Sequence, residues 1–255
     1  MQFPELAILT STLGSRNLLP IRSNHLLAAV EQRLNERTRL RLELYNRADR
    51  DLPFQSFAEP RLIFNSAQVS RVFVPPVSPL WYNALRGYSR GAEIFLQRSS
   101  ANRFNGWVSY AYGRTNQRDG VSGARFVSDY DQRHTVNIFT GYRLRPSVHV
   151  SVHASYGSGF PIPAWLSFSN GVYNLALQRN QLRMDYYQRM DFRTNKTWTH
   201  AKWKTTLYGE VLNITNRTNR IFNSLNSYNA TTGRTSISRD SMFPILPSIG
   251  ILFER

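Results

Sequence analysis

The stretch Arg39-Leu40-Arg41-Leu42-Glu43-Leu44-Tyr45 decides the fold of this chain. Every second residue is leucine, and the residues between the leucines are charged or amphipathic. On a helix these leucines would point to three sides. On a strand, where alternate side chains lie on opposite faces, they form one apolar stripe. The stretch is therefore predicted to be a strand with one apolar face and one charged face.

The same period-two alternation recurs along the chain and predicts nine strands in all. Phe95 and Phe139 break the pattern, because they fall on the polar side of their strands. Residues 3–12 are a candidate for a tenth strand, although the run Leu6-Ala7-Ile8-Leu9 does not alternate cleanly. The apolar stripes of the other eight strands are Leu26, Ala28, Val30; Ala92, Ile94, Leu96; Val108, Tyr110, Tyr112; Val136, Ile138, Tyr142; Val148, Val150, Val152, Ala154; Met190, Phe192; Leu207, Val211; and Ile249, Ile251, Phe253.

The links between these strands alternate in length. Loops longer than about 15 residues are uncommon in compact soluble domains, whereas short turns on one rim and long loops on the other are typical of outer-membrane barrels. We therefore predict an all-β, antiparallel up-and-down meander of about 9–10 strands that forms part of a transmembrane outer-membrane β-barrel. Short turns are expected at 34–36, 98–103, 145–146 and 197–202, and long loops at 48–87, 115–131, 157–186 and 214–242.

Aromatic residues near the strand ends agree with a barrel, since such rings form girdles at the level of the lipid headgroups. Aromatics that close the ends of a soluble sandwich core are the alternative explanation. The 255 residues contain 32 Lys and Arg against 16 Asp and Glu and no cysteine. Without cysteine the chain has no disulfide framework, thiolate zinc site or cysteine nucleophile. The longest apolar run, Leu26 to Val30, is far shorter than the ~20 residues of a membrane-spanning helix.

Several segments resemble the C-terminal part of TonB-dependent outer-membrane receptors. Residues 207–216 (LYGEVLNITN) are similar to the penultimate strand of that family and its Asn-x-x-Asn exit. Residues 129–137 (DYDQRHTVN) are similar to the Asp-x-Arg-His entry into a downward strand. Residues 187–193 and 247–254 resemble the other late strands, and 89–95 resembles an earlier one more weakly. The resemblance extends from about residue 24 to the end of the chain.

This resemblance implies a ligand-gated importer of scarce substrates such as metal chelates, vitamin-type cofactors or glycans. In that family a barrel of about 22 strands holds an N-terminal plug, and the inner-membrane TonB complex supplies energy through a TonB box. The implied location is the bacterial outer membrane. The implied partners are outer-membrane lipid, the barrel assembly machinery and, in the full-length receptor, a plug domain and TonB.

The plug, the TonB box and about half of the barrel would precede Met1, so we expect the chain to be a fragment of such a receptor. Residues 1–20 are expected to be an irregular segment or the remnant of a preceding strand or loop, and 21–255 the C-terminal part of the barrel. Residues 1–14 also lack the basic start and long apolar run of a signal peptide. Family barrels tend to end in an aromatic residue, whereas this chain ends in Arg255.

Eight charged residues share the face opposite the apolar stripes. An Arg or Lys on the lipid side at the bilayer midplane would cost ~2–4 kcal/mol, so these residues are predicted to line the barrel lumen. Two roles stay open for them, a structural ladder of cross-strand and plug-facing salt bridges or direct contact with substrate. The eight are Arg39, Arg41, Glu43, Glu93, Arg189, Asp191, Arg193 and Glu210. In the long loops, candidates for substrate contact are Trp81, Tyr82, Tyr88, Trp165 and Tyr173.

No motif points to catalysis, and we expect no enzyme activity, no catalytic residue, no cofactor and no metal site. His149 and His153 would lie ~13 Å apart on a strand, too far to share a metal ion. The chain has no nucleophile elbow and no phosphate-binding glycine loop. Two alternatives to the receptor remain. One is a porin or adhesin-type barrel that does not use TonB. The other is a basic β-protein that binds nucleic acid, although the basic residues look evenly spread along the chain.

Overall fold

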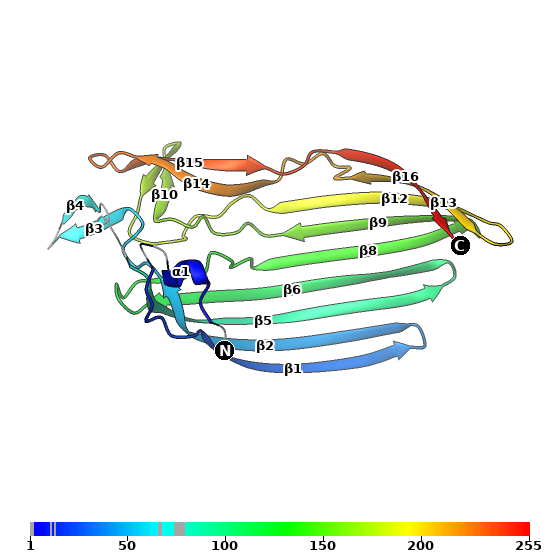
Figure 1. Ribbon diagram of the computed structural model, residues 1–255, viewed down its shortest axis with the longest axis horizontal. Coiled ribbons are helices and arrows are strands. Elements are labelled where there is room, and N and C mark those ends of the chain that lie inside the picture. The colour runs from blue at the N-terminus through cyan, green and yellow to red at the C-terminus, as the bar shows by residue number, and fades with distance from the viewer. Residues whose placement is uncertain (1–2, 11, 13, 66–67, 74–79) are drawn as a thin grey trace.

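The computed structural model describes residues 3–10, 12, 14–65, 68–73 and 80–255. Its main feature is a ten-stranded antiparallel sheet whose long strands follow one another in chain order (Figure 1). This arrangement confirms the predicted up-and-down meander. The order is β1 (Arg22–Asn35), β2 (Thr38–Phe54), β5 (Tyr82–Ala101), β6 (Phe104–Asp119), β8 (His134–Arg145), β9 (Val148–Gly157), β12 (Tyr187–Thr199), β13 (Lys204–Leu212) and β16 (Leu246–Glu254), with β7 (Arg125–Val127) added beside β6.

The sheet does not close on itself, because β1 and β16 end the strand order. All four short turns lie at one end of the sheet, on the right of Figure 1, and the long links lie at the other end. The predicted alternation of link lengths is thus confirmed. The turn between β5 and β6 holds Asn102 and Arg103 at φ 50° and 69°, the left-handed backbone that a two-residue hairpin turn requires.

The strand register places the predicted apolar stripes on one face. Residues directly opposite in an antiparallel pair point to the same side of the sheet. Such a row crosses five strands, from Leu96 through Val108, Ile138 and Ala154 to Met190. We call this face the apolar face. It is uncovered at its large side chains, since Leu44 is 62% exposed and Ile249 is 77% exposed.

The long links contain strands that the alternation did not predict. One link holds the hairpin of β3 (Arg61–Asn65) and β4 (Gln68–Phe73). Two other links together form a second sheet in the order β10-β11-β15-β14, made of β10 (Leu166–Ser169), β11 (Val172–Leu175), β14 (Arg220–Tyr228) and β15 (Arg234–Ser241). The buried cluster of Ile162, Ala164, Leu166 and Leu175 lies here. The hydrophobic core therefore sits in the loop layer, not in the main sheet.

Residues 3–12 do not supply a tenth strand, because Leu6–Thr10 forms the helix α1. The run of consecutive apolar residues that failed to alternate is compatible with a helix, and the Thr10 hydroxyl donates to the carbonyl oxygen of Leu6, 2.9 Å away. None of the helices in the described part of the chain is long and apolar enough to cross a membrane.

Candidate functional site

The eight charged candidates lie on one face of the main sheet, which we call the polar face. The register pairs Arg39, Arg41 and Glu43 with Gln97, Phe95 and Glu93, and it pairs Arg193 with Glu210. Arg189 and Asp191 alternate in step with Arg193 on β12, and rows through β6, β8 and β9 connect the two groups. The apolar stripes occupy the alternate positions of the same strands, so this face is the reverse of the apolar face.

Ion pairs on the polar face form mainly within strands. Arg41 bonds Glu43, and the Arg189 Nε lies 2.7 Å from the Asp191 Oδ1. Each pair joins residues two apart on one strand, which share a face and lie about 7 Å apart along the backbone. Two longer contacts cross strands among the described residues, with 3.6 Å between Arg39 and Glu31 and 4.0 Å between the His153 Nδ1 and the Asp191 Oδ2. The expected cross-strand ladder is therefore largely replaced by pairs along single strands.

An aromatic row crosses the middle of the polar face. Trp107 lies directly opposite Phe139, with 6.4 Å between their ring centroids, and its ring is 6.0 Å from that of Phe95. His153 continues the row, and its Nδ1 lies 4.0 Å from the Asp191 Oδ2. Phe95 and Phe139, which broke the sequence pattern, thus belong to one half-buried cluster.

Tyr45 packs flat across two neighbouring strands on the polar face. A Cβ on Gly91 would lie 2.4 Å from the Tyr45 hydroxyl, and a Cβ on Gly113 would lie 2.7 Å from it. Only glycine leaves room for the ring at these two positions, which face each other across β5 and β6. A ring laid over strand glycines is a known device for fixing the register of a sheet.

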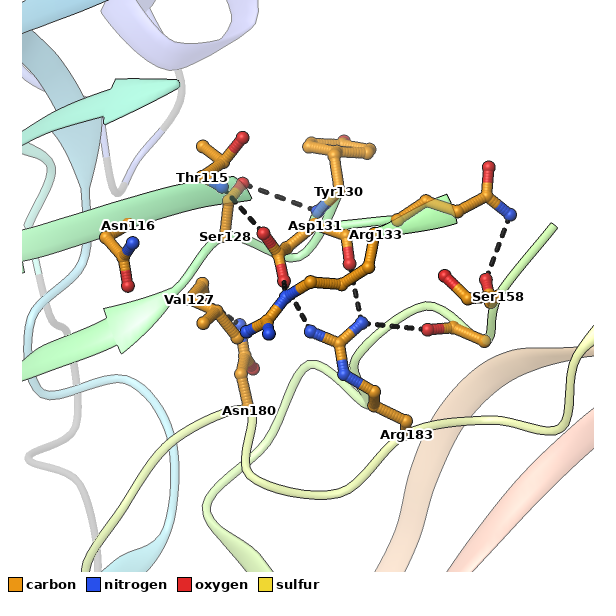
Figure 2. Close-up of polar contacts among 12 residues, drawn as sticks. Thr115, Asn116, Val127, Ser128, Tyr130, Asp131, Arg133, Ser158, Asn180 and Arg183 are labelled. Carbon is orange, nitrogen blue, oxygen red and sulfur yellow. Dashed lines mark hydrogen bonds and ion pairs between the residues drawn. The ribbon is translucent and has the colours of Figure 1, made fainter. Parts of the chain in front are cut away.

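At the loop end of the sheet, Asp131 holds two long links together (Figure 2). Its side chain is fully buried and accepts hydrogen bonds from the Thr115 N–H at 2.6 Å, from the Arg133 Nε at 3.0 Å and from Arg183. Arg183 also donates to the carbonyl oxygens of Asp131 and Gly159, at 2.6 and 2.9 Å. Because Arg183 comes from the link between β9 and β12, Asp131 ties that link to the start of β8.

These bonds set the ionisation of Asp131. Burial by itself would raise the pKa of the Asp131 carboxyl. The hydrogen bonds from Thr115, Arg183 and Arg133 outweigh burial and hold that pKa below its ordinary value. Asp131 and Arg133 belong to the segment that resembles the Asp-x-Arg-His entry, so the structure gives this motif a structural task in the loop layer.

Arg179 forms a second buried tie between the long links. Its side chain is 4% exposed, bonds both oxygens of Glu59 at 2.7 Å and also bonds Asp129. Its guanidinium carbon lies 5.1 Å from the centre of the Phe126 ring. Burial alone would lower the pKa of Arg179, but the two carboxylates raise it above its ordinary value. One cation thereby joins three links that are distant in sequence.

The Asn-x-x-Asn segment shapes the exit from β13. Asn213 and Asn216 have φ angles of 50° and 48°, a left-handed conformation that asparagine tolerates better than most residues. The Asn213 side chain donates to the carbonyl oxygens of Arg217 and Phe243, at 3.0 and 3.1 Å. Both ends of the long link between β13 and β16 are thereby held together.

Among the cavities at this end of the described chain, two are large and lined partly by loop residues. The larger measures about 800 Å³, and its lining includes Tyr88, Asn116 and several arginines. The second measures about 550 Å³ and is lined largely by aromatic and aliphatic side chains such as Phe160, Met184 and Phe222. In the described residues, no group of three or more His, Cys, Asp or Glu side chains is placed to hold a metal ion.

The loop aromatics proposed from sequence are not equivalent. Tyr88 lines the larger cavity, and Tyr82 is 50% exposed. Trp165 is buried under the Arg61 guanidinium, whose central carbon lies 4.6 Å from the ring centroid. Tyr173 packs on Phe168, with ring centroids 4.8 Å apart. Trp165 is therefore a core residue of the loop layer and is not available to a substrate.

Solved structures show what this architecture is similar to. The chain matches the ferripyoverdine receptor of the Pseudomonas aeruginosa outer membrane with a TM-score of 0.55 and 14% identity, over 92% of this chain and 27% of the receptor. It matches the outer membrane transporter YddB of Escherichia coli with a TM-score of 0.55 and 10% identity, over 94% of this chain and 33% of that one. It matches the FrpB iron transporter of Neisseria meningitidis with a TM-score of 0.53 and 12% identity, over 92% of this chain and 32% of that transporter.

The chain has the fold of an outer-membrane receptor barrel wall. It spans a third or less of the length of these solved structures. No family model matches the sequence, and no curated protein matches it. At such low identity the likeness concerns the fold alone, and the strand order of that fold is what the alternating pattern predicted.

Proposed function

We propose that this chain is a section of the wall of a TonB-dependent receptor in the bacterial outer membrane. The observation that carries the proposal is the apolar face. The nine strands of the meander direct their apolar stripes to one side of the sheet, and large side chains there, such as Leu44 and Ile249, are exposed. Soluble monomeric proteins rarely expose a large contiguous apolar surface, and such a surface marks a site of protein or membrane contact. Hydrocarbon is the environment that suits it.

The polar face supports a water-filled or plug-filled interior. Its eight charged candidates would then line the lumen, where water or a plug can solvate them. The aromatic row of Phe95, Trp107 and Phe139 would give a plug domain an apolar strip to pack against. The role we propose is transport without chemistry of its own, and the similar solved structures are receptors and transporters.

The substrate class that we propose to test first is a chelated metal ion. Two of the similar structures are named for iron uptake, the ferripyoverdine receptor and the FrpB iron transporter. Import would require energy from TonB, as the resemblance implies. The ties made by Asp131 and Arg179 support such a role, because they hold the long links in a fixed arrangement at the end of the barrel where a ligand would arrive.

The open edges of the sheet require partners in a membrane. Unpaired backbone N–H and C=O groups of β1 and β16 would cost several kcal/mol each in hydrocarbon. We therefore propose that further strands complete the barrel and that the barrel assembly machinery inserts it. Bacterial single-chain barrels have an even strand number, whereas the meander from β1 to β16 has nine members.

Spin labels on adjacent residues test the orientation of the wall. The chain has no cysteine, so Ile94→Cys and the matched neighbour Glu93→Cys can each carry one label in protein placed in lipid bilayers. We expect the label at 94 to collide with dissolved oxygen, which concentrates in hydrocarbon. The label at 93 should instead collide with a water-soluble nickel chelate. Equal access of the nickel chelate to both labels would refute the proposal.

Two further observations separate the receptor from its alternatives. A plug-type domain with a TonB box in the adjoining coding sequence supports the receptor, and an intact gene without one supports a porin or adhesin. Binding of single-stranded oligonucleotides that weakens steeply with salt would support the nucleic-acid alternative.

A further inference from the structure

Three arginines form a row across the loop end of the main sheet. Arg86 lies directly opposite Arg118, and Arg118 lies directly opposite Arg125. On the same face, two rows nearer the turns, Arg90 lies opposite Arg114. All five are exposed. They occupy the same alternate positions as Ile94 and Val108, so they continue the apolar face towards the loops.

This row lacks anionic partners. Within the described part of the chain, no acidic side chain lies within ion-pair distance of Arg86, Arg118 or Arg125. Like charges placed directly opposite one another on a sheet are destabilising. The basic residues are thus not evenly spread, as the sequence suggested, because the register gathers them at one place. A bound anion would relieve the repulsion.

The row lies at the height expected of lipid headgroups. The apolar band of an outer-membrane barrel is about 25 Å tall, and its strands tilt by about 40°. At about 3.3 Å per residue a strand crosses this band in about ten residues. On β6, ten residues from the exposed Phe104 at the turn end lead to Arg114. By the same geometry Arg118 stands about 10 Å higher, beyond the hydrocarbon.

A cavity of about 800 Å³ adjoins the row, and its lining includes Arg86, Arg118 and Arg125. The acidic residue of the lining, Asp49, already accepts hydrogen bonds from Arg47 at 2.9 Å and from Ser23 at 2.5 Å. The cavity is therefore cationic, and it has the volume of a site for a small molecule.

Polar and aromatic side chains complete the lining. The Tyr88 hydroxyl accepts a hydrogen bond from Asn116 at 3.1 Å, and the Arg90 guanidinium stacks on the Tyr88 ring at 4.4 Å from its centroid. An amphipathic ring at this height suits the boundary between hydrocarbon and headgroups. The site thus offers arginines for an anion directly above an apolar surface for hydrocarbon chains.

We infer that Arg86, Arg118 and Arg125 bind the phosphate groups of anionic lipid headgroups in the leaflet on the loop side. Guanidinium groups match phosphate oxygens in bidentate geometry, and the apolar face below the row would hold the acyl chains. The inference rests on the proposed membrane orientation. It does not depend on a transported substrate, so a failure of transport leaves it standing.

Native mass spectrometry of the whole chain in maltoside micelles tests this inference. The micelles are titrated with phosphatidic acid, which carries a phosphomonoester, or with phosphatidylcholine as the zwitterionic control. The variant is Arg86→Gln, Arg118→Gln and Arg125→Gln combined. The matched control removes the same charge at the turn end, through Arg37→Gln, Arg98→Gln and Arg103→Gln. Circular dichroism checks that both triple variants keep their β-structure.

We expect a discrete adduct of one phosphatidic acid whose affinity falls roughly a hundredfold in the loop-end variant, since each arginine near an anionic surface contributes about 1 kcal/mol. The affinity of the turn-end variant for phosphatidic acid should fall less than about tenfold. Equal losses in both variants would mean non-specific attraction and would overturn the inference. Displacement of the lipid by inorganic phosphate alone, or tighter binding of a single-stranded oligonucleotide, would also overturn it in favour of a soluble anion.

Discussion

Replacement of Asp131 by asparagine should release the link between β9 and β12 from the sheet. The carboxylate accepts three hydrogen bonds, two of them from arginines and one from the Thr115 N–H. A charge-assisted bond contributes about 1.5–3 kcal/mol, against about 0.5–1.5 kcal/mol for a neutral one. The change to an amide therefore costs about 1 kcal/mol per bond. Arg133 and Arg183 are about a third exposed, so solvent screening reduces the total to about 2 kcal/mol.

A loss of about 2 kcal/mol corresponds to an opening that is about 30 times more frequent. Hydrogen–deuterium exchange of peptides from residues 158–186, and of the peptide containing Thr115, would report this opening. Asp185→Asn is the matched control, because Asp185 lies in the same link and makes no ion pair with the described residues. Exchange that is equally slow in the Asp131 and Asp185 variants would refute the assignment of Asp131 as the tie.

Acid should act on the same tie. The pKa of Asp131 is lower in the folded chain than in the unfolded chain, where it is about 3.9. A lowered pKa means that the carboxylate stabilises the fold fully above the unfolded pKa. That contribution is lost as the pH falls below about 4 towards the folded pKa. Exchange in 158–186 should therefore be independent of this group from neutral pH to about pH 5. It should accelerate below pH 4 in the wild-type chain but not in the Asp131→Asn variant.

Three other substitutions test the remaining contacts. Gly91→Val places a Cβ 2.3 Å from the carbonyl oxygen of Tyr112. We expect the free energy of unfolding, measured in urea, to fall by about 1–3 kcal/mol. The control Gly209→Val should leave it unchanged, because the nearest atom to a Cβ there is 3.8 Å away. The Arg179→Lys variant cannot bridge two carboxylates, so we expect the free energy of local opening to fall by about 2–4 kcal/mol. Hydrogen–deuterium exchange at 125–129 should then be faster, and unchanged exchange would contradict the tie. Asn213→Ala should cost about 1–2 kcal/mol more than Asn213→Gly in thermal unfolding, because glycine accepts the left-handed backbone; equal losses would show that only the side-chain bonds matter.

The main sheet was predictable because its signal is local. In Arg39-Leu40-Arg41-Leu42 the period of two is visible in the sequence and does not depend on what lies beside the strand. The loop layer was not predictable in the same way. Leu166 and Leu175 are buried against each other in strands of four residues, which are too short to show an alternation.

The ties depend on contacts between distant residues. Arg179 meets Glu59 across 120 positions of sequence, and Arg183 meets Asp131 across 52. Nothing in either local sequence specifies the partner. The arginine row is an intermediate case. Arg86 and Arg90 on one strand, and Arg114 and Arg118 on the next, are each four residues apart and so share a face of their strand, which was readable. The register that brings them side by side was not.

The strands of the main sheet differ in length, and this difference decides how far each one extends on the loop side. The short turns all lie at one end of the sheet (Figure 1), while β5 runs from Tyr82 to Ala101 and β9 only from Val148 to Gly157. A membrane crossing needs about ten residues, so in the proposed orientation β9 would span the bilayer and little more. The excess of β5 and β6 must then project beyond the headgroups on the loop side. That projection carries the arginine row at its base and the ties of Asp131 and Arg179 above it. Shortening β5 and β6 together by two paired residues each, at 87–88 and 116–117, should therefore leave spin-label accessibility at position 94 unchanged. It should displace the loop layer towards the bilayer, and a change in accessibility at 94 would contradict this division of the strands.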